Sequence, residues 1–272
     1  MKRIAFIFMG LLVSHSAYSQ ISSSTLIVFQ LVNNKFIMAA DSRGSFDGSP
    51  HDTYCKIATF RDQVIFAAGS GPLYVPTNLD PAPPWNATDE AHKAIAANAS
   101  KRGRDSGGRV KSIADTWAEN MRINWQTLNG FHPDLVNKFA QDERGNMTTG
   151  VFATASHGRV SFTVRSIVLN NGVITIVPHQ DNCSSGPCAS GTTDIFTEYF
   201  SGTNQRAKTE FRTPQPLPKE MSPEMAHIIR LVDLTITYDT THTVGPIDAV
   251  ELRTDGSIRW LQRKPNCPAN QD

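Results

Sequence analysis

The sequence has 272 residues, of which 39% are apolar and 19% are charged. This length accommodates one large domain or two small ones, and the composition is typical of a folded globular protein rather than of a disordered chain. The formal net charge of +1 gives no electrostatic reason to expect nucleic acid or an acidic membrane surface as a partner.

The N-terminal segment has the pattern of a targeting signal. Two basic residues are followed by an apolar run at 4–13 and by a small-x-small cleavage site at 17–19. The run is too short to span a bilayer comfortably, although an uncleaved anchor is the alternative interpretation. We therefore expect residues 1–19 to be a signal peptide and residues 20–24 to be a short lead or propeptide. The mature protein is expected to be secreted or periplasmic, without membrane contact once the signal is cleaved.

The four cysteines fit an oxidising compartment. Cys183 and Cys188 flank a Ser-Ser-Gly-Pro turn that would bring them into bridging range, so the sequence predicts a disulfide between them. Cys55 and Cys267 are left to pair or to stay free. A metal site is the rival interpretation, but no cysteine pair has His or Asp partners at ligand spacing, and no cofactor is expected.

The first two predicted strands, at 25–32 and 35–40, are joined by a tight Asn33-Asn34 turn. Both are almost continuously apolar, which is typical of strands that are buried on both faces. Asp41 follows the second strand directly. Because a carboxylate is costly to bury without a partner, we expect Asp41 to contact a charged or hydrogen-bonding group.

The remaining elements alternate between groups of strands and groups of helices. Further strands are expected at 56–58, 64–68, 149–155, 159–169, 172–177, 247–252 and 257–262. Helices are expected from Thr88 as a cap, at 112–128, from His132, at 191–200, and from Ser222 to about Asp239. The segments 72–87 and 203–220 read as loops, and the basic segment 101–111 reads as a solvated connector rather than an anion site. Strands grouped in runs favour sheets covered by helices over alternating βαβ units.

Four stretches of the chain resemble the proteasome-type family of N-terminal nucleophile hydrolases, which includes bacterial proteasome-like peptidases. The stretches are 24–28 leading to 39–43, then 55–57, then 66–71, and finally 222–224 through 238–239 to 245–248 and 254–256. This resemblance implies an α+β fold, a four-layer αββα sandwich of two antiparallel sheets. It implies a single domain at 25–264, followed by a polar tail at 265–272.

The resemblance also implies a nucleophile. In this family the attacking group is the hydroxyl of the first residue of the processed chain, and its own α-amine is the base. A free α-amine has a pKa of about 8, so it can accept a proton near neutral pH. Counting back from Asp41 without a gap places Thr25 at the nucleophile position. One extra residue in the preceding turn would place Ser24 there instead.

Other residues correspond to the groups that support the nucleophile. Lys56 matches the family lysine, whose charge lowers the pKa of the α-amine, and Asp41 matches the carboxylate that holds this lysine. The remaining implied site residues are Arg43 as a supporting cation, Gly71 (with Gly69 as second choice) as the oxyanion donor, Thr192 after Gly191, Asp239 as a second acid, and either His242 or Thr243. The alternative is that Asp41 only caps a strand end and that Lys56 is an ordinary surface charge.

The sequence therefore predicts a secreted or periplasmic amide-bond hydrolase, a threonine-type peptidase with an N-terminal nucleophile. Its expected partner is a peptide or another amide substrate, and a homo-oligomer is left open. The alternative is a catalytically inactive proteasome-like protein with a binding or structural role. The serines at 22–24 and the absence of a glycine before the nucleophile favour that alternative.

Other classes of enzyme have no local support in the sequence. The G-x-S-x-G, H-E-x-x-H, G-x-G-x-x-G and P-loop patterns are absent. A serine hydrolase of another fold, a zinc enzyme and a nucleotide enzyme are therefore not favoured.

Overall fold

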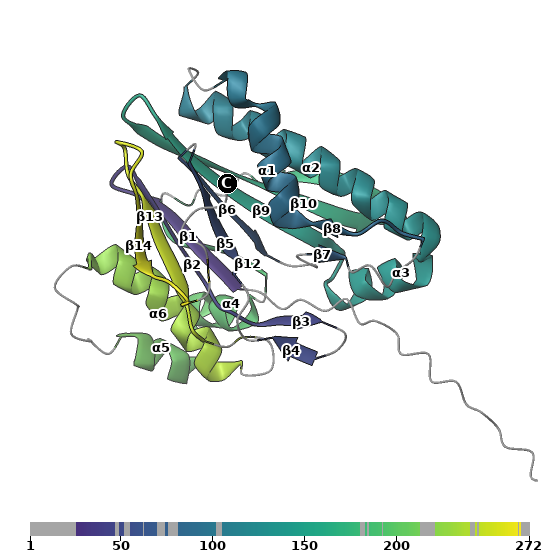
Figure 1. Ribbon diagram of the computed structural model, residues 1–272. Coiled ribbons are helices and arrows are strands. Elements are labelled where there is room, and N and C mark those ends of the chain that lie inside the picture. Colours follow the sequence, from purple (N-terminus) through teal and green to yellow (C-terminus); the bar gives the residue numbers. More distant parts are fainter. Residues whose placement is uncertain are drawn as a thin grey trace, which may run out of the picture.

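The computed structural model describes residues 26–46, 49–51, 55–61, 63–69, 74–75, 81–101, 105–179, 183, 185–191, 193–212, 221–239, 243, 245–265 and 267. Two five-stranded antiparallel sheets are stacked between two groups of helices (Figure 1). The α+β class and the four-layer αββα sandwich expected from the sequence are confirmed.

The first sheet has the strand order β12-β1-β2-β13-β14, and the second has the order β11-β10-β9-β6-β5. The strands of the first sheet are β1 (Leu26–Val32), β2 (Lys35–Ala40), β12 (Cys188–Gly191), β13 (Asp248–Leu252) and β14 (Ile258–Gln262). Those of the second are β5 (Ile57–Phe60), β6 (Val64–Gly69), β9 (Asn146–Ser156), β10 (Arg159–Asn170) and β11 (Val173–His179). Two small hairpins are formed by β3 (Gly44–Phe46) with β4 (Ser49–His51) and by β7 (Tyr74–Val75) with β8 (Trp85–Asn86).

The helices divide between the two outer faces of the sandwich. Those of the described residues are α1 (Ala87–Ala97), the 3-10 turn η1 (Ala99–Lys101), α2 (Ser106–Phe131), α3 (Pro133–Asp142), α4 (Asp194–Ser201), α5 (Gln205–Arg212) and α6 (Pro223–Tyr238). Helices α1, α2 and α3 cover the second sheet, and α4, α5 and α6 cover the first (Figure 1).

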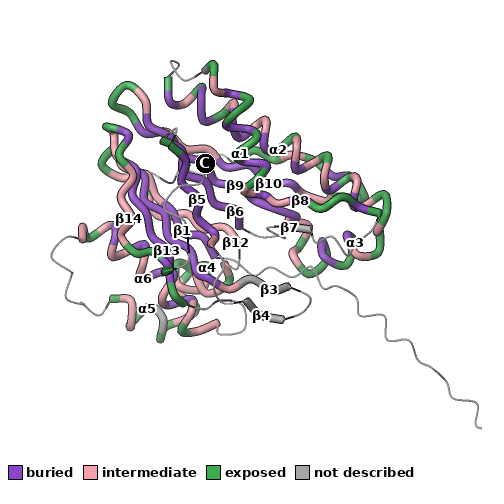
Figure 2. Tube along the Cα trace, in the orientation of Figure 1, coloured by how far each residue is buried: buried purple, intermediate pink, exposed green. Residues whose placement is uncertain are grey.

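Side chains alternate between the two faces of each strand, and they form three hydrophobic cores on different faces of the sheets. In β1, Leu26 and Val28 point toward α6, whereas Ile27 and Phe29 point into the space between the sheets. In β6, Phe66 packs with Trp117 of α2 in a third core on the other side of the second sheet. Successive strand residues point to opposite faces, so a strand that is covered on both faces needs a continuous apolar run. The buried strands lie together in the middle of the tube drawing (Figure 2).

The hairpin turns have the backbone geometry that their residues favour. Asn33 and Asn34 have φ values of 50° and 57°, and Asn171 and Gly172 have values of 49° and 78°. Two consecutive left-handed residues form the turn whose twist matches that of paired strands, and Asn and Gly adopt this conformation most readily. The turns therefore fix the register of β1 with β2 and of β10 with β11.

Several predicted boundaries are wrong, for local or tertiary reasons. Helix α1 is capped by Asn86 rather than Thr88, since the Asn86 side chain accepts from the backbone N–H of Thr88 at 2.7 Å. The predicted helix at 191–200 starts at Asp194, because Gly191 belongs to β12 and pairs with Leu26.

Three segments predicted to be irregular contain regular structure. The loop at 72–87 includes β7 and β8, and the loop at 203–220 includes α5, which packs through Phe211 against Tyr199. The basic segment at 101–111 is not a simple connector: it enters α2 at Ser106, and Arg109 is buried against the second sheet. Strands β7 and β8 pair with each other within their segment, whereas α5 and the start of α2 form because they pack against other elements.

All four cysteines are paired. The predicted Cys183–Cys188 disulfide is confirmed, and it lies within the segment that leads into β12. Cys55 pairs with Cys267, a question that the sequence left open. Because Cys55 precedes β5 and Cys267 follows β14, this second disulfide connects an edge of one sheet to an edge of the other.

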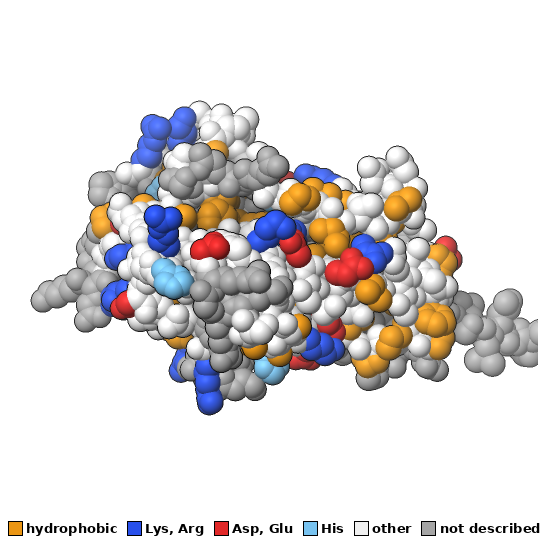
Figure 3. All heavy atoms as spheres, turned by 90° about the horizontal axis from the view of Figure 1, so that it is seen from above, with side chains coloured by type: hydrophobic (Ala, Val, Ile, Leu, Met, Phe, Trp, Pro, Cys, Tyr) orange, Lys and Arg blue, Asp and Glu red, His pale blue; other side chains and the backbone are white. Residues whose placement is uncertain are grey.

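The surface carries charges of both signs. On the face shown in Figure 3, Lys and Arg side chains are interspersed with Asp and Glu side chains. Exposed pairs on α2, such as Lys111 with Asp115, follow the same pattern. Among the described helices, none combines the length and apolar character needed to cross a membrane.

Candidate active site

The ends of several strands meet at one end of the sandwich. Asp41 follows β2, Lys56 precedes β5, and Leu26 begins β1. Gly191 ends β12 directly opposite Leu26, and Gly69 ends β6. We refer to these five residues as the strand-end site. Because the two sheets are stacked, charged groups that follow or precede their strands can meet between the layers.

The carboxylate of Asp41 is held by three donors. Its Oδ1 accepts from Lys56 Nζ at 2.8 Å and from the backbone N–H of Leu26 at 2.9 Å. Its Oδ2 accepts from the backbone N–H of Arg43 at 3.0 Å. A buried carboxylate is stable only when its oxygen atoms are hydrogen-bonded, and these contacts meet that requirement.

Lys56 forms the other half of a buried ion pair. The side chains of Lys56 and Asp41 have no exposed surface, so the interpretation of Lys56 as a surface charge is wrong. Burial lowers the pKa of the Lys56 ammonium from 10.5 to about 8, although Asp41 opposes this effect. The positive charges of Lys264 and Arg43 lower the pKa of Lys56 further. Near neutral pH Lys56 is therefore still mostly an ammonium group, and it lies beside the start of β1.

The ion pair is also a connection between the sheets. Asp41 belongs to the segment after β2 of the first sheet, and Lys56 to the segment before β5 of the second. The two residues are 15 apart in sequence. Their contact therefore depends on how the sheets are stacked, and it fixes that stacking at this end.

The start of β1 lies against the ion pair. The backbone N–H of Leu26 contacts Asp41, and the backbone N–H of Asp41 in turn donates to the Leu26 carbonyl oxygen at 3.3 Å. Gly191 is the cross-strand partner of Leu26 and has a φ of 98°, a conformation that favours glycine. The segments that carry Asp41, Lys56 and Gly191 are thus assembled around the residue that follows position 25.

Gly69 is closely surrounded at the same end of the sandwich. A Cβ atom at this position would lie 3.0 Å from Cδ1 of Ile27 and 3.1 Å from Oγ of Ser190. The end of β6 therefore approaches β1 and β12 closely, which requires a small residue. The second choice for the oxyanion donor thus lies close to β1 and β12 within the strand-end site.

Three other residues expected in the site, Arg43, Asp239 and Thr243, have contacts that the structure shows. Arg43 is half-buried, and its backbone N–H binds Asp41. Asp239 caps the C-terminus of α6, where its carbonyl oxygen accepts from the N–H of Thr243 at 3.1 Å and from its hydroxyl at 2.8 Å. Thr243 is buried. Asp239 and Thr243 are therefore linked to each other.

Five expected residues lie outside the described part of the chain, namely Ser24, Thr25, Gly71, Thr192 and His242. Two of them directly adjoin described residues: Thr25 precedes Leu26, and Thr192 follows Gly191.

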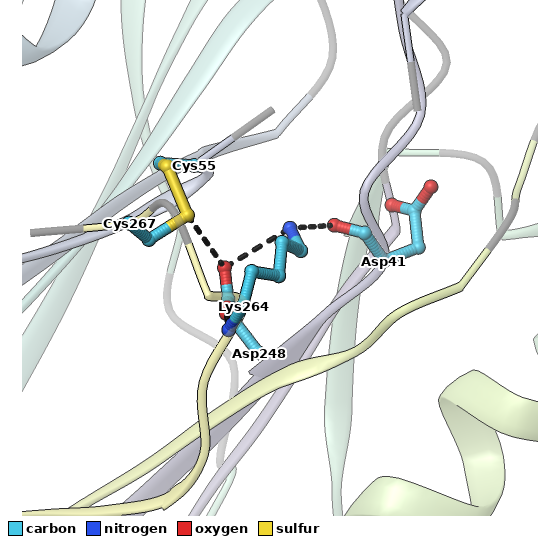
Figure 4. Close-up of a disulfide and its surroundings, with 5 residues drawn as sticks. All are labelled: Asp41, Cys55, Asp248, Lys264 and Cys267. Carbon is cyan, nitrogen blue, oxygen red and sulfur yellow. Dashed lines mark hydrogen bonds and ion pairs between the residues drawn. A yellow bond between two sulfur atoms is a disulfide. The ribbon is translucent and has the colours of Figure 1, made fainter. Parts of the chain in front are cut away.

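Two charged residues of this region were missed in the sequence. Lys264 and Asp248 form a second buried ion pair at 3.0 Å, and Lys264 Nζ also donates to the backbone carbonyl oxygen of Asp41 at 3.2 Å (Figure 4). Asp248 is the first residue of β13, so it resembles Asp41 as a carboxylate at the end of an apolar strand. Lys264 and Cys267 lie at or just beyond the expected domain end at 264, yet both are buried. Pairing the two remaining cysteines would have placed Lys264 near Lys56.

The described ranges contain no group of three or more His, Cys, Asp or Glu residues placed to hold a metal ion. The described groups of the site are a buried ammonium and its carboxylate next to the start of a strand, and both act through their charge.

Comparison with known proteins gives distant structural likenesses, one of which is described here. No protein-family model matches this sequence, and no curated protein matches it. The chain is similar to the solved structure of a mutant of Anbu from Hyphomicrobium sp. strain MC1, with a TM-score of 0.48 and 14% identity. The match covers 89% of this chain and 88% of that chain. A likeness of this size carries no argument about chemistry.

Proposed function

We propose that this protein is a secreted or periplasmic amide-bond hydrolase, a threonine-type peptidase whose nucleophile is Thr25 at a processed N-terminus. The observation that carries the proposal is the contact of the buried Lys56–Asp41 pair with the backbone amide of Leu26. Leu26 follows position 25 directly. The ion pair therefore lies at the peptide unit that links the proposed nucleophile to β1.

The proposed reaction begins when the hydroxyl of Thr25 attacks the carbonyl carbon of a substrate amide. The free α-amine of the same residue accepts the hydroxyl proton and passes it to the leaving nitrogen as the C–N bond breaks. An ester between the substrate acyl group and Thr25 remains. Water then hydrolyses this ester, which releases the acid and restores the hydroxyl. Gly71, or Gly69 as second choice, would supply a backbone N–H to the oxyanion.

Lys56 has the properties that this reaction requires. A positive charge near an α-amine lowers the pKa of the amine, so that more of it is the neutral base near neutral pH. Lys56 is held by Asp41 in a site without solvent, where its charge acts through a low dielectric. Below its own pKa of about 8, Lys56 is mostly charged and can perform this role.

Two disulfides support a location outside the cytoplasm. Disulfides persist in secreted and periplasmic proteins and are rare where thiols are kept reduced. Both pairs, Cys55–Cys267 and Cys183–Cys188, have Cα atoms about 5.5 Å apart, in the usual range for such bonds. Together with the apolar segment at 4–13, they favour export of the chain.

Two measurements test the proposal together: the first residue of the mature chain and its rate of amide hydrolysis. Mass spectrometry of the mature protein should find a chain that begins at Thr25. It should begin at Ser24 if the count back from Asp41 allows one extra residue in the Asn33-Asn34 turn. This protein should hydrolyse fluorogenic peptide amides, and Thr25→Ala and Lys56→Ala should lower the rate about 100-fold or more. Lys35→Ala, at a partly exposed lysine of β2, serves as the control and should leave the rate unchanged.

A mature chain that begins at Gln20 and shows no amide hydrolysis would contradict the proposal. That result would favour the inactive proteasome-like alternative, because a blocked residue 25 has no free α-amine to act as the base.

A further inference from the structure

The second buried ion pair joins Lys264 to Asp248 through two contacts. Lys264 Nζ lies 3.0 Å from Asp248 Oδ2, and the backbone N–H of Lys264 donates to Asp248 Oδ1 at 2.9 Å. The exposed fraction is 3% for the Lys264 side chain and zero for that of Asp248. Such a pair is costly to desolvate, and a hydrophobic pair of similar volume is often as stable. Its presence therefore calls for an explanation other than stability.

Lys264 connects this unit to the candidate active site. Its Nζ donates to the backbone carbonyl oxygen of Asp41 at 3.2 Å, across 223 residues of sequence. In Figure 4 the Lys264 ammonium points between Asp248 and Asp41. Asp41 is thus bound through its carboxylate by Lys56 and through its carbonyl group by Lys264. The two contacts together restrict both the backbone and the side chain of Asp41.

The Cys55–Cys267 disulfide fastens the two lysine-bearing segments to each other. Cys55 directly precedes Lys56, and the backbone N–H of Cys267 donates to the carbonyl oxygen of Lys264 at 3.2 Å. A disulfide sulfur has no hydrogen, so the 4.0 Å approach of Cys267 Sγ to Asp248 Oδ2 is a packing contact. One covalent bond thus holds two like-charged groups in the same buried region.

This arrangement has an electrostatic consequence for Lys56. Like charges in a region of low dielectric repel each other, and each makes protonation of the other less favourable. The charge of Lys264 accordingly lowers the pKa of Lys56, while burial lowers the pKa of Lys264 itself against the opposing effect of Asp248. Lys264 therefore acts on Lys56 through both the position of Asp41 and the local potential.

We propose that Lys264 is a positioning residue of the candidate active site, which holds Asp41 against Lys56 and Leu26 and is itself held by Asp248 and the Cys55–Cys267 disulfide. On this view Lys264 and Cys267, at and just beyond the expected domain end, are part of the site. The catalytic meaning of this placement rests on the proposed function, but the placement can be tested without activity.

The direct test is an NMR titration of the Lys56 side chain in the mature full-length protein. Lysine-selective labelling follows the Nζ and Cε signals, and Lys56→Met identifies the signal of Lys56. In Lys264→Met the midpoint of Lys56 should rise by about one pH unit, because a nearby positive charge is removed. Lys264→Arg keeps the charge and should restore the midpoint, and Lys35→Met is the control that leaves it unchanged.

An unchanged Lys56 midpoint in a folded Lys264→Met variant would overturn the proposal. If that variant does not fold, the disulfides supply a second test. The double variant Cys55→Ser with Cys267→Ser should shift the Lys56 midpoint, whereas Cys183→Ser with Cys188→Ser should not, since that bond lies within one layer. Equal midpoints in the two double variants would likewise overturn it.

Kinetics separate this inference from the proposed function. If the protein hydrolyses amides, Lys264→Met should lower kcat more than it changes KM and should move the alkaline limb of the pH profile upward with the Lys56 midpoint. If the wild-type protein has no such activity but the Lys56 midpoint still responds to Lys264, then the proposed function fails and the positioning of Asp41 and Lys56 stands.

Discussion

Lys56 and Asp41 form an ion pair between the two sheets, with 2.8 Å between Nζ and Oδ1 and no exposed surface on either side chain. Removal of one partner from such a pair leaves an uncompensated charge in the core. The pair therefore couples the candidate chemistry to the packing of the sheets, and the first two predictions concern this coupling.

Asp41→Asn should destabilise the fold by about 3 kcal/mol or more, because Lys56 loses its counterion while the shape of the site is kept. The free energy of unfolding from urea titration measures this loss. Asp233→Asn is the matched control: Asp233 pairs with Arg230 at 3.0 Å but is half exposed, so its loss should stay below about 1 kcal/mol. Similar losses in the two variants would show that the Asp41 pair is not closed to water.

The stability of the protein should depend on pH through Lys56. The pKa of Lys56 is about 8 in the folded protein and 10.5 without burial, so the unfolded chain binds more protons between these values. The free energy of unfolding should therefore rise with pH in this window, relative to a Lys56→Met variant, by up to about 3 kcal/mol. Urea titrations of both proteins from about pH 7 to about pH 11 measure the difference, and a flat difference contradicts the prediction.

The two disulfides should differ in their contributions to stability. Cys55–Cys267 joins residues 212 apart in sequence, whereas Cys183–Cys188 joins residues 5 apart. The longer loop restricts the unfolded chain more, so its removal by paired Cys→Ser substitutions should cost about 5 kcal/mol, against about 2 kcal/mol for the shorter. Urea unfolding of the two double variants gives the comparison. The prediction fails if the shorter bond contributes as much as the longer one.

Gly150→Ala should destabilise the packing of α2 on the second sheet. A Cβ atom at this position of β9 would lie 2.5 Å from ring carbons of Trp117, which is fully buried. Since the ring has no room to move, we expect a loss of about 1–3 kcal/mol and a lower Tm. Gly130→Ala is the control, because a Cβ atom in this exposed part of α2 meets no other atom within 4 Å, and alanine favours helix. Equal Tm changes would mean that Trp117 adjusts freely.

The local sequence was enough to predict turns and helix caps, because these depend on only a few neighbouring residues. Asn33 and Asn34 adopt the left-handed conformation of a tight hairpin turn, and the Ser222 side chain caps α6 by accepting from the N–H of Met225. The two-residue period of side chains in a strand explains why β1 and β2, covered on both faces, are almost continuously apolar. The same reasoning required a partner for Asp41, since a buried carboxylate without one is too costly.

Only the tertiary structure showed that Lys264 and Asp248 form a second buried ion pair beside Asp41. Lys264 is the last residue of the domain expected from the sequence and had no expected role, yet the stacking of the sheets and the bond between Cys55 and Cys267 place it against Asp41. The sequence by itself thus determined the hairpin, its apolar faces and the need to neutralise Asp41. The resemblance had already paired Lys56 with Asp41, and the structure added Lys264, a lysine from a distant part of the chain, as a second group that binds Asp41. Hydrogen bonds within a turn or a cap depend on neighbouring residues, whereas the burial of a charge depends on segments that are distant in sequence.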